Sequence, residues 1–145
     1  MTCTELLLSL QKHGAYMAAG CDMKKSLLLN QTLQNMRTAI LPEFMIELYK
    51  QCGGINLGNA YIFGPDPVER GKNYPIPSIT DINRDIAKFQ NILKQKTVFG
   101  RNDLFWFAFD PFGICYMLDN ITLNPLRKYD DPYRAIYDCL IAGKI

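Results

Sequence analysis

The sequence contains a single histidine, and this scarcity excludes most side-chain arrangements on which catalysis depends. A Ser-His-Asp or Cys-His arrangement would have to use His13. His13 precedes Gly14 at the expected end of the first helix, where a histidine interacts favourably with the last carbonyl groups. We therefore interpret His13 as part of a helix end, and we assign no catalytic residue.

Cysteines with the spacing of a metal site are also lacking. The five cysteines are odd in number and no two follow C-x-x-C, which argues against a disulfide framework and a zinc site. Cys52, Cys115 and Cys139 lie among apolar residues, and we interpret them as small buried side chains. The glycines from Gly53 to Gly64 come after a predicted helix and not after a strand, so they do not form a phosphate loop. We expect reduced thiols, a cytoplasmic location, no metal and no cofactor.

Neither charge nor hydrophobicity is concentrated in one part of the chain. The net charge is +2, too little to indicate duplex DNA or an anionic membrane as a partner. No apolar run approaches the length of a membrane span. The first residues are not expected to form a signal peptide, because Glu5 stands where a basic region is required. We expect neither nucleic acid nor a membrane as a partner.

Helical periodicity is present in five stretches. The clearest is LPEFMIELYKQCGG, in which Pro42 suits the first helical position and Gly53 with Gly54 supplies a stop. The predicted helices are residues 4–12, residues 23–38, the segment after Pro42, the segment 78–93 with Ser78 as its cap, and the segment after Asp131 with Pro132 as its first residue.

Strand patterns are present from residue 55 onward. The segment DPFG, residues 110–113, has the residues of a type I turn. With Gly113 in the left-handed region, this turn pairs Ala108 with Tyr116 and Trp106 with Leu118. The predicted strands are two in INLGNAYIFG joined at Gly58–Asn59, then TVFG, LFWFAFD, ICYMLD and, as a candidate, NPLRKY.

The segments between these elements complete the prediction. Residues 15–22 are expected to be a link, and residues 64–77, with four prolines, a long loop of the kind that is usually functional or mobile. Strands and helices are segregated along the chain. This order predicts one α+β domain over residues 1–145, with an antiparallel meander packed against helices.

The strand LFWFAFD is apolar on both faces. One face carries three phenylalanines and is expected to lie under helices. The opposite face carries the indole of Trp106 and, from the next predicted strand, the phenol of Tyr116. Such side chains are enriched where proteins meet partners. Either the chain itself, for example the loop 64–77, covers this second face, or it is a concave surface that receives a partner. The candidate partner-binding residues are Trp106 and Tyr116, with Arg101 and Asp103 at the rim.

In the order of its segments, the chain resembles the SUKH superfamily, which includes fungal Smi/Knr-type regulators of cell-wall assembly and many bacterial proteins. LPEFMIELYKQCGG resembles the Leu-Pro, helix, Asn-Gly opening of that family. NAYIFG, TVFGRNDLFWFAFD, GICYMLD and a final helix then follow in the family's order. The resemblance covers about residues 29–142. Cys52 stands where the family usually has Asn, whereas Gly53 is retained.

The resemblance implies a non-catalytic domain that binds another protein. Many bacterial members are immunity proteins that bind and block a cognate polymorphic toxin, often a nuclease or deaminase, whereas fungal members resemble signalling scaffolds. Two hypotheses follow. The first is a protein-binding module, most concretely an immunity protein; the alternative is a small-ligand-binding or enzymatic domain that uses an aromatic pocket. The lack of convergent ionisable groups favours the first, and the sequence does not indicate an oligomeric state.

Overall fold

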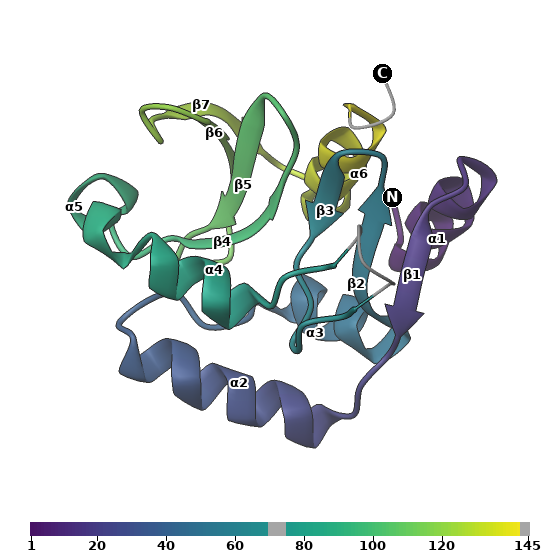
Figure 1. Ribbon diagram of the computed structural model, residues 1–145, viewed down its shortest axis with the longest axis horizontal. Helices are drawn as coiled ribbons and strands as arrows, with labels where there is room; N and C mark the ends of the chain where they lie inside the picture. The colour runs from purple at the N-terminus through teal and green to yellow at the C-terminus, as the bar shows by residue number, and fades with distance from the viewer. Residues whose placement is uncertain (70–74, 143–145) are drawn as a thin grey trace.

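The computed structural model describes residues 1–69 and 75–142, and its central feature is a seven-stranded antiparallel sheet. The strands lie in chain order, so each one pairs with its neighbours in the sequence (Figure 1). They are β1 (Tyr16–Ala19), β2 (Cys52–Leu57), β3 (Ala60–Ile62), β4 (Thr97–Arg101), β5 (Phe105–Phe109), β6 (Cys115–Asp119) and β7 (Pro125–Tyr129). The predicted α+β class with an antiparallel meander is confirmed.

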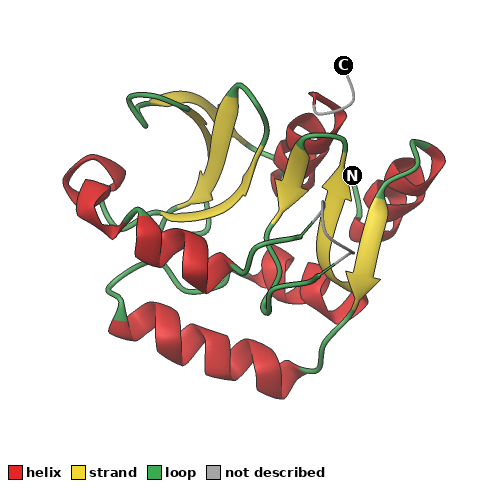
Figure 2. Ribbon diagram, in the orientation of Figure 1, coloured by secondary structure: helices red, strands yellow, loops and turns green. Residues whose placement is uncertain are grey.

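Six α-helices in the described residues pack against this sheet and against one another (Figure 2). They are α1 (Cys3–Lys12), α2 (Met23–Asn35), α3 (Glu43–Gln51), α4 (Ile79–Asp85), α5 (Gln90–Leu93) and α6 (Pro132–Ala142), with a 3-10 turn, η1 (Ala87–Phe89). Helix α6 contacts every strand from β2 to β7, and α1 packs against α3 and α6. Helix α4 contacts β4 and α2. In this part of the chain no helix has both the length and the apolar character needed to cross a bilayer.

The hydrophobic core is one continuous cluster that contains side chains from the helices and from the sheet. Phe99 of β4 stacks on Phe109 of β5, with ring centres 5.8 Å apart, and Phe44 of α3 meets both rings edge-on. Edge-on and offset aromatic pairs are favourable beyond their buried area. The cysteines predicted to be small buried side chains belong to this cluster: Cys52, Cys115 and Cys139.

Residues 15–22, predicted as a link, instead contain strand β1. It pairs with β2, where Tyr16 lies opposite Asn56 and Met17 opposite Ile55. Four residues are too few to establish an alternating pattern, and the partner strand lies far along the chain. The strand therefore depends on a tertiary contact that local periodicity does not reveal.

Helix α2 ends at Asn35, earlier than the predicted residue 38. Arg37 has a φ of 61°, which interrupts the helical backbone. The hydroxyl group of Thr38 then donates to the carbonyl oxygen of Leu33 at 3.1 Å and holds the chain reversal.

The helix after Pro42 is present, but both of its ends differ from the prediction. Pro42 is the N-cap residue in an extended conformation, with ψ of 167°, and not the first helical residue. At the other end the chain becomes extended at Cys52, so Gly53 and Gly54 lie within β2 and do not form the stop. A Cβ on Gly53 would stand 2.6 Å from the carbonyl oxygen of Ala19, so close pairing of β1 with β2 requires this glycine.

The predicted helix over residues 78–93 is divided into three short pieces. Ser78 caps α4 as predicted, because its hydroxyl accepts the amide of Asp81 at 3.1 Å. The α-helix then gives way to η1, and α5 ends at Leu93, before Lys94, whose φ is 53°. The near-heptad apolar spacing in this stretch thus belongs to three pieces and not to one continuous helix, and the middle piece, η1, has no buried residue.

Asn83 explains how α4 is joined to the sheet. Its side-chain amide donates to the carbonyl of Val98 and accepts from the amide of Val98, both at 2.8 Å. Val98 lies beyond the part of β4 that pairs with β3. The two bonds from Asn83 satisfy the backbone groups of Val98 that a neighbouring strand would otherwise bind.

The predicted loop over residues 64–77 falls only partly within the described residues. A parallel bridge joins Gly64 to Ser78, and an antiparallel bridge joins Val68 to Ile76. Residues 70–74 of this prediction lie outside the described residues.

The hairpin of β5 and β6 has the register that the DPFG segment predicts. Ala108 lies opposite Tyr116 and Trp106 opposite Leu118. Gly113 has a φ of +80°, and its amide donates to the carbonyl of Asp110 at 2.9 Å. A Cβ on Gly113 would lie 3.1 Å from Cβ of Pro42, so the tip of this hairpin closely approaches the start of α3.

The last two elements also agree with the sequence. NPLRKY forms β7, an edge strand in which only Tyr129 is buried. Helix α6 begins at Pro132, and a carboxylate oxygen of Asp131 accepts the amide of Tyr133 at 3.0 Å, as the capping prediction requires.

Candidate functional site

Two of the predicted partner-binding residues lie in direct contact. Arg101 of β4 and Trp106 of β5 are opposite each other in the sheet. The guanidinium group of Arg101 lies over the indole ring, 5.6 Å from its centre, which is a favourable cation–π distance. Arg101 is exposed and Trp106 is half-buried, so this pair is accessible from the surface.

Tyr116 of β6 lies on the same sheet face as Trp106. It is opposite Ala108, which follows Trp106 by two residues on β5. Its hydroxyl donates to a carboxylate oxygen of Asp110 at 3.3 Å, and the ammonium group of Lys96 lies 5.1 Å from its ring centre. Burial, reinforced by the charge of Asp110, raises the pKa of the Tyr116 phenol. Tyr116 is thus held in a small polar cluster at the root of the β5–β6 hairpin.

Asp103 lies in the turn between β4 and β5, away from the ring of Trp106. One of its carboxylate oxygens accepts the side-chain amide of Asn59 at 3.0 Å, which joins two neighbouring turns of the sheet. The structure therefore brings Trp106, Arg101 and Tyr116 together on one face and directs Asp103 to the adjacent turn.

The two faces of β5 differ in burial. Phe107 and Phe109 are buried and Phe105 is half-buried, as expected of the face under the helices. The other face is mixed, because Ala108 and Leu118 are buried while the aromatic side chains remain half-buried. The chain covers part of this second face and leaves the rest accessible.

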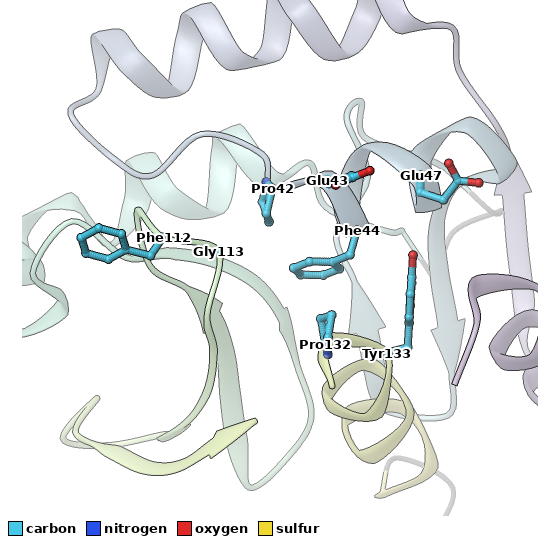
Figure 3. A pocket seen from close by; sticks show the side chains of 8 residues that line it. All are labelled: Pro42, Glu43, Phe44, Glu47, Phe112, Gly113, Pro132 and Tyr133. Atoms are coloured by element: carbon cyan, nitrogen blue, oxygen red, sulfur yellow. The ribbon is translucent and has the colours of Figure 1, made fainter. Parts of the chain in front are cut away.

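The structure also contains a groove that the sequence does not predict. It lies where α3, the β5–β6 hairpin and the start of α6 meet, and it has a volume of about 570 Å³ (Figure 3). Its lining residues are Pro42, Glu43, Phe44, Glu47, Phe112, Gly113, Pro132 and Tyr133. They come from three distant parts of the sequence, and the only local signal is the spacing of two glutamates one helical turn apart on α3.

The walls of this groove combine aromatic rings with carboxylates. Phe44 contacts Tyr133 edge-on, with ring centres 6.1 Å apart. Burial, with smaller contributions from Cys3 and Glu47, raises the pKa of the Tyr133 phenol to about 12. Burial likewise raises the pKa of the Cys3 thiol, again with a contribution from Glu47. Both groups are therefore protonated at neutral pH and act as hydrogen-bonding or packing groups, not as nucleophiles.

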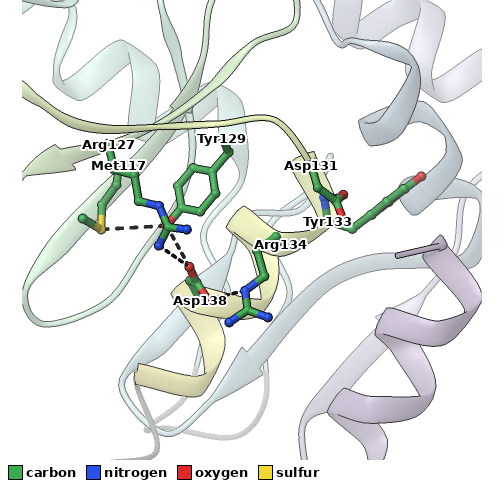
Figure 4. A network of polar contacts seen from close by, with 7 residues as sticks. All are labelled: Met117, Arg127, Tyr129, Asp131, Tyr133, Arg134 and Asp138. Carbon is green, nitrogen blue, oxygen red and sulfur yellow. Dashed lines mark hydrogen bonds and ion pairs between the residues drawn. The ribbon is translucent and has the colours of Figure 1, made fainter.

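A polar network beside the groove has a structural role (Figure 4). The carboxylate of Asp138 on α6 accepts from Arg127, from the hydroxyl of Tyr129 and from Arg134, at 3.0 to 3.2 Å. The hydroxyl oxygen of Tyr129 also lies 3.9 Å from the sulfur of Met117. These bonds fasten edge strand β7 to α6.

The remaining candidates for chemistry are separated from one another. His13 caps α1 as predicted, with Nδ1 2.8 Å from the carbonyl oxygen of Ser9. Within residues 1–69 and 75–142, no group of three His, Cys, Asp or Glu side chains is arranged to hold a metal ion. All five cysteines are free thiols in the structure.

The chain matches no protein-family model and no curated protein. The resemblance to the SUKH superfamily therefore stays a prediction from the sequence.

Proposed function

We propose that the protein is a non-catalytic protein-binding domain, most concretely a cytoplasmic immunity protein that binds and neutralises a cognate toxin, or a related regulatory scaffold. The observation that carries the proposal is the accessible pair of Trp106 and Arg101 on a rigid sheet face. Trp, Tyr and Arg are the residue types that dominate binding energy at protein interfaces. The resemblance of the chain to the SUKH superfamily supports the immunity role.

The proposed contact surface consists of Trp106, Tyr116 and Arg101, with Asp103 at its edge. The cation–π pair orients Trp106 before binding, so little side-chain entropy is lost when a partner covers it. The partner is a protein, and neither nucleic acid nor a membrane is required.

One observation favours the alternative, a small-ligand-binding or enzymatic domain. The groove beside α3 has a volume typical of ligand sites, and three aromatic residues line it, Phe44, Phe112 and Tyr133. Its ionisable lining groups are two exposed carboxylates and a phenol of raised pKa. This lining suits recognition of a cation better than general acid–base catalysis at neutral pH.

The proposal is tested by co-expression with a toxin encoded beside this chain in its native host. The wild-type protein is expected to restore growth and to form a complex with the purified toxin. Trp106→Ala should weaken this complex by about 2 kcal/mol or more, as for an interface anchor, and should lose growth rescue.

Two further variants separate binding from folding. Phe107→Ala, at a position only 1% exposed, should lower the melting temperature more than Trp106→Ala does. Leu8→Ala, at an exposed position of α1, should change neither rescue nor binding. If Trp106→Ala unfolds the protein as severely as Phe107→Ala, this face is core and the proposed contact surface is wrong.

A further inference from the structure

Two carboxylates stand at the rim of the groove without a cation beside them. Glu43 and Glu47 lie one turn apart on the exposed side of α3. In the described residues neither takes part in an ion pair; Glu47 only accepts a long hydrogen bond of 3.4 Å from Gln51. Both charges are therefore available to an incoming positive group.

The walls between these carboxylates and α6 are aromatic. In Figure 3 the Tyr133 hydroxyl points toward α3 on the side of Glu47, and the Phe44 ring lies between Pro42 and Pro132. Ring faces attract cations, and prolines with an aromatic ring offer an apolar path for an alkyl stem. The groove thus combines the two features that bind a long basic side chain.

The local charge is opposite in sign to that of the whole molecule. The chain has a net charge of +2, whereas the lining of the groove contains two carboxylates and no Lys or Arg. Asp131, which precedes the lining residue Pro132, already pairs with the N-terminal ammonium of Met1 at 3.1 Å. The uncompensated charge is therefore that of Glu43 and Glu47.

We infer that this groove receives an arginine or lysine side chain of the partner protein, with its charged end between Glu43 and Glu47 and its stem against Phe44 and Tyr133. The identity of the partner rests on the proposed function, but the groove can be tested without it. This contact would lie apart from the Trp106 face and give the partner a second anchor.

The test uses two positively charged small probes and one neutral probe. N-acetyl-arginine amide and N-acetyl-lysine amide are titrated into the isotopically labelled full chain, with N-acetyl-citrulline amide as the neutral isostere of arginine. Amide resonances of Glu43–Glu47, Gly113 and Tyr133 are expected to shift with the two basic probes, and about fivefold less with citrulline. Equal shifts with citrulline, or largest shifts elsewhere on the chain, would overturn the inference.

A charge-neutral variant supplies the second arm of the test. The double variant Glu43→Gln, Glu47→Gln should weaken binding of the arginine probe about fivefold. Glu5→Gln is the matched control, because Glu5 also lies in the first turn of a helix and is exposed. It should leave binding unchanged, and an equal loss in the control would contradict a specific role for the groove.

The two proposals fail in different ways. Probe binding at the groove without any neutralisation of a toxin would reject the immunity function and keep the cation site. Neutralisation that depends on Trp106, without probe binding at the groove, would keep the function and reject the cation site.

Discussion

Asp138 is the residue that joins edge strand β7 to α6. Its side chain is 21% exposed and accepts hydrogen bonds from two guanidinium groups and one phenol. Hydrogen bonds to charged groups are worth more than neutral ones, and loss of this acceptor leaves Tyr129 and Arg127 without their shared partner.

We predict that Asp138→Ala lowers the free energy of unfolding by about 1–3 kcal/mol, measured by urea denaturation. The control is Arg134→Ala, which removes one ion pair between residues four apart on a helix and a cation–π contact with Tyr137, and should cost about 1 kcal/mol or less. Equal effects of the two substitutions would show that Asp138 contributes only a surface ion pair.

Helix α3 places four buried side chains in the core, Phe44, Met45, Leu48 and Tyr49. Leu48 is completely buried, and Phe44 contacts two rings of the sheet. Leu48→Ala or Phe44→Ala should lower the free energy of unfolding by about 2–5 kcal/mol, because each leaves a cavity among rigid neighbours. Lys50→Ala, at an exposed position of the same helix, should be nearly neutral. A melting temperature unchanged by both core substitutions would contradict the packing of α3.

Elements with strong local signals could be predicted from the sequence. The register of the β5–β6 hairpin follows from four turn residues, and the starts of α4 and α6 follow from Ser78 and Asp131, since turns and caps depend on nearby backbone. Strand β1 could not be found, because its existence depends on pairing with β2. The division of residues 78–93 also depends on distant contacts, among them the bonds from Asn83 to Val98.

The candidate sites were predictable to different degrees. Trp106 and Tyr116 share a face because strand alternation and the hairpin register are local properties, and the structure places them as expected. The position of Asp103 depends on its bond to Asn59 in another turn. The groove beside α3 joins three segments that are far apart in the sequence, so no local pattern reveals it.

For the whole molecule, the buried thiols predict sensitivity to alkaline pH. Burial raises the pKa of Cys52 and of Cys115 from 9.0 to about 12. Between these values the unfolded chain loses protons that the folded protein keeps, so the free energy of unfolding falls as pH rises above 9. Each thiol contributes about 1.4 kcal/mol per pH unit within this window. Lys96 opposes this trend. Burial lowers the pKa of its ammonium group, so the cost of burying that charge disappears when the group loses its proton at high pH.

The measurement is a series of urea denaturation curves between pH 7 and pH 11 under reducing conditions. Stability should be nearly constant below pH 8 and should then decline. Cys115→Ala is expected to make this decline less steep, because one thiol that contributes to the slope is removed. This holds whatever the effect of the substitution on stability at neutral pH. An unchanged slope in this variant would show that the Cys115 thiol ionises as readily in the folded protein as in the unfolded chain.

The position of α6 after all seven strands in the sequence has a consequence for synthesis on the ribosome. Every strand pairs with the strand made just before it, so the meander can assemble while the chain is still emerging. Helix α6, with 11 residues, contacts six of the seven strands and is translated after all of them. Until it emerges, the nascent sheet lacks the helix that contacts these six strands, so part of its apolar face stays uncovered during synthesis.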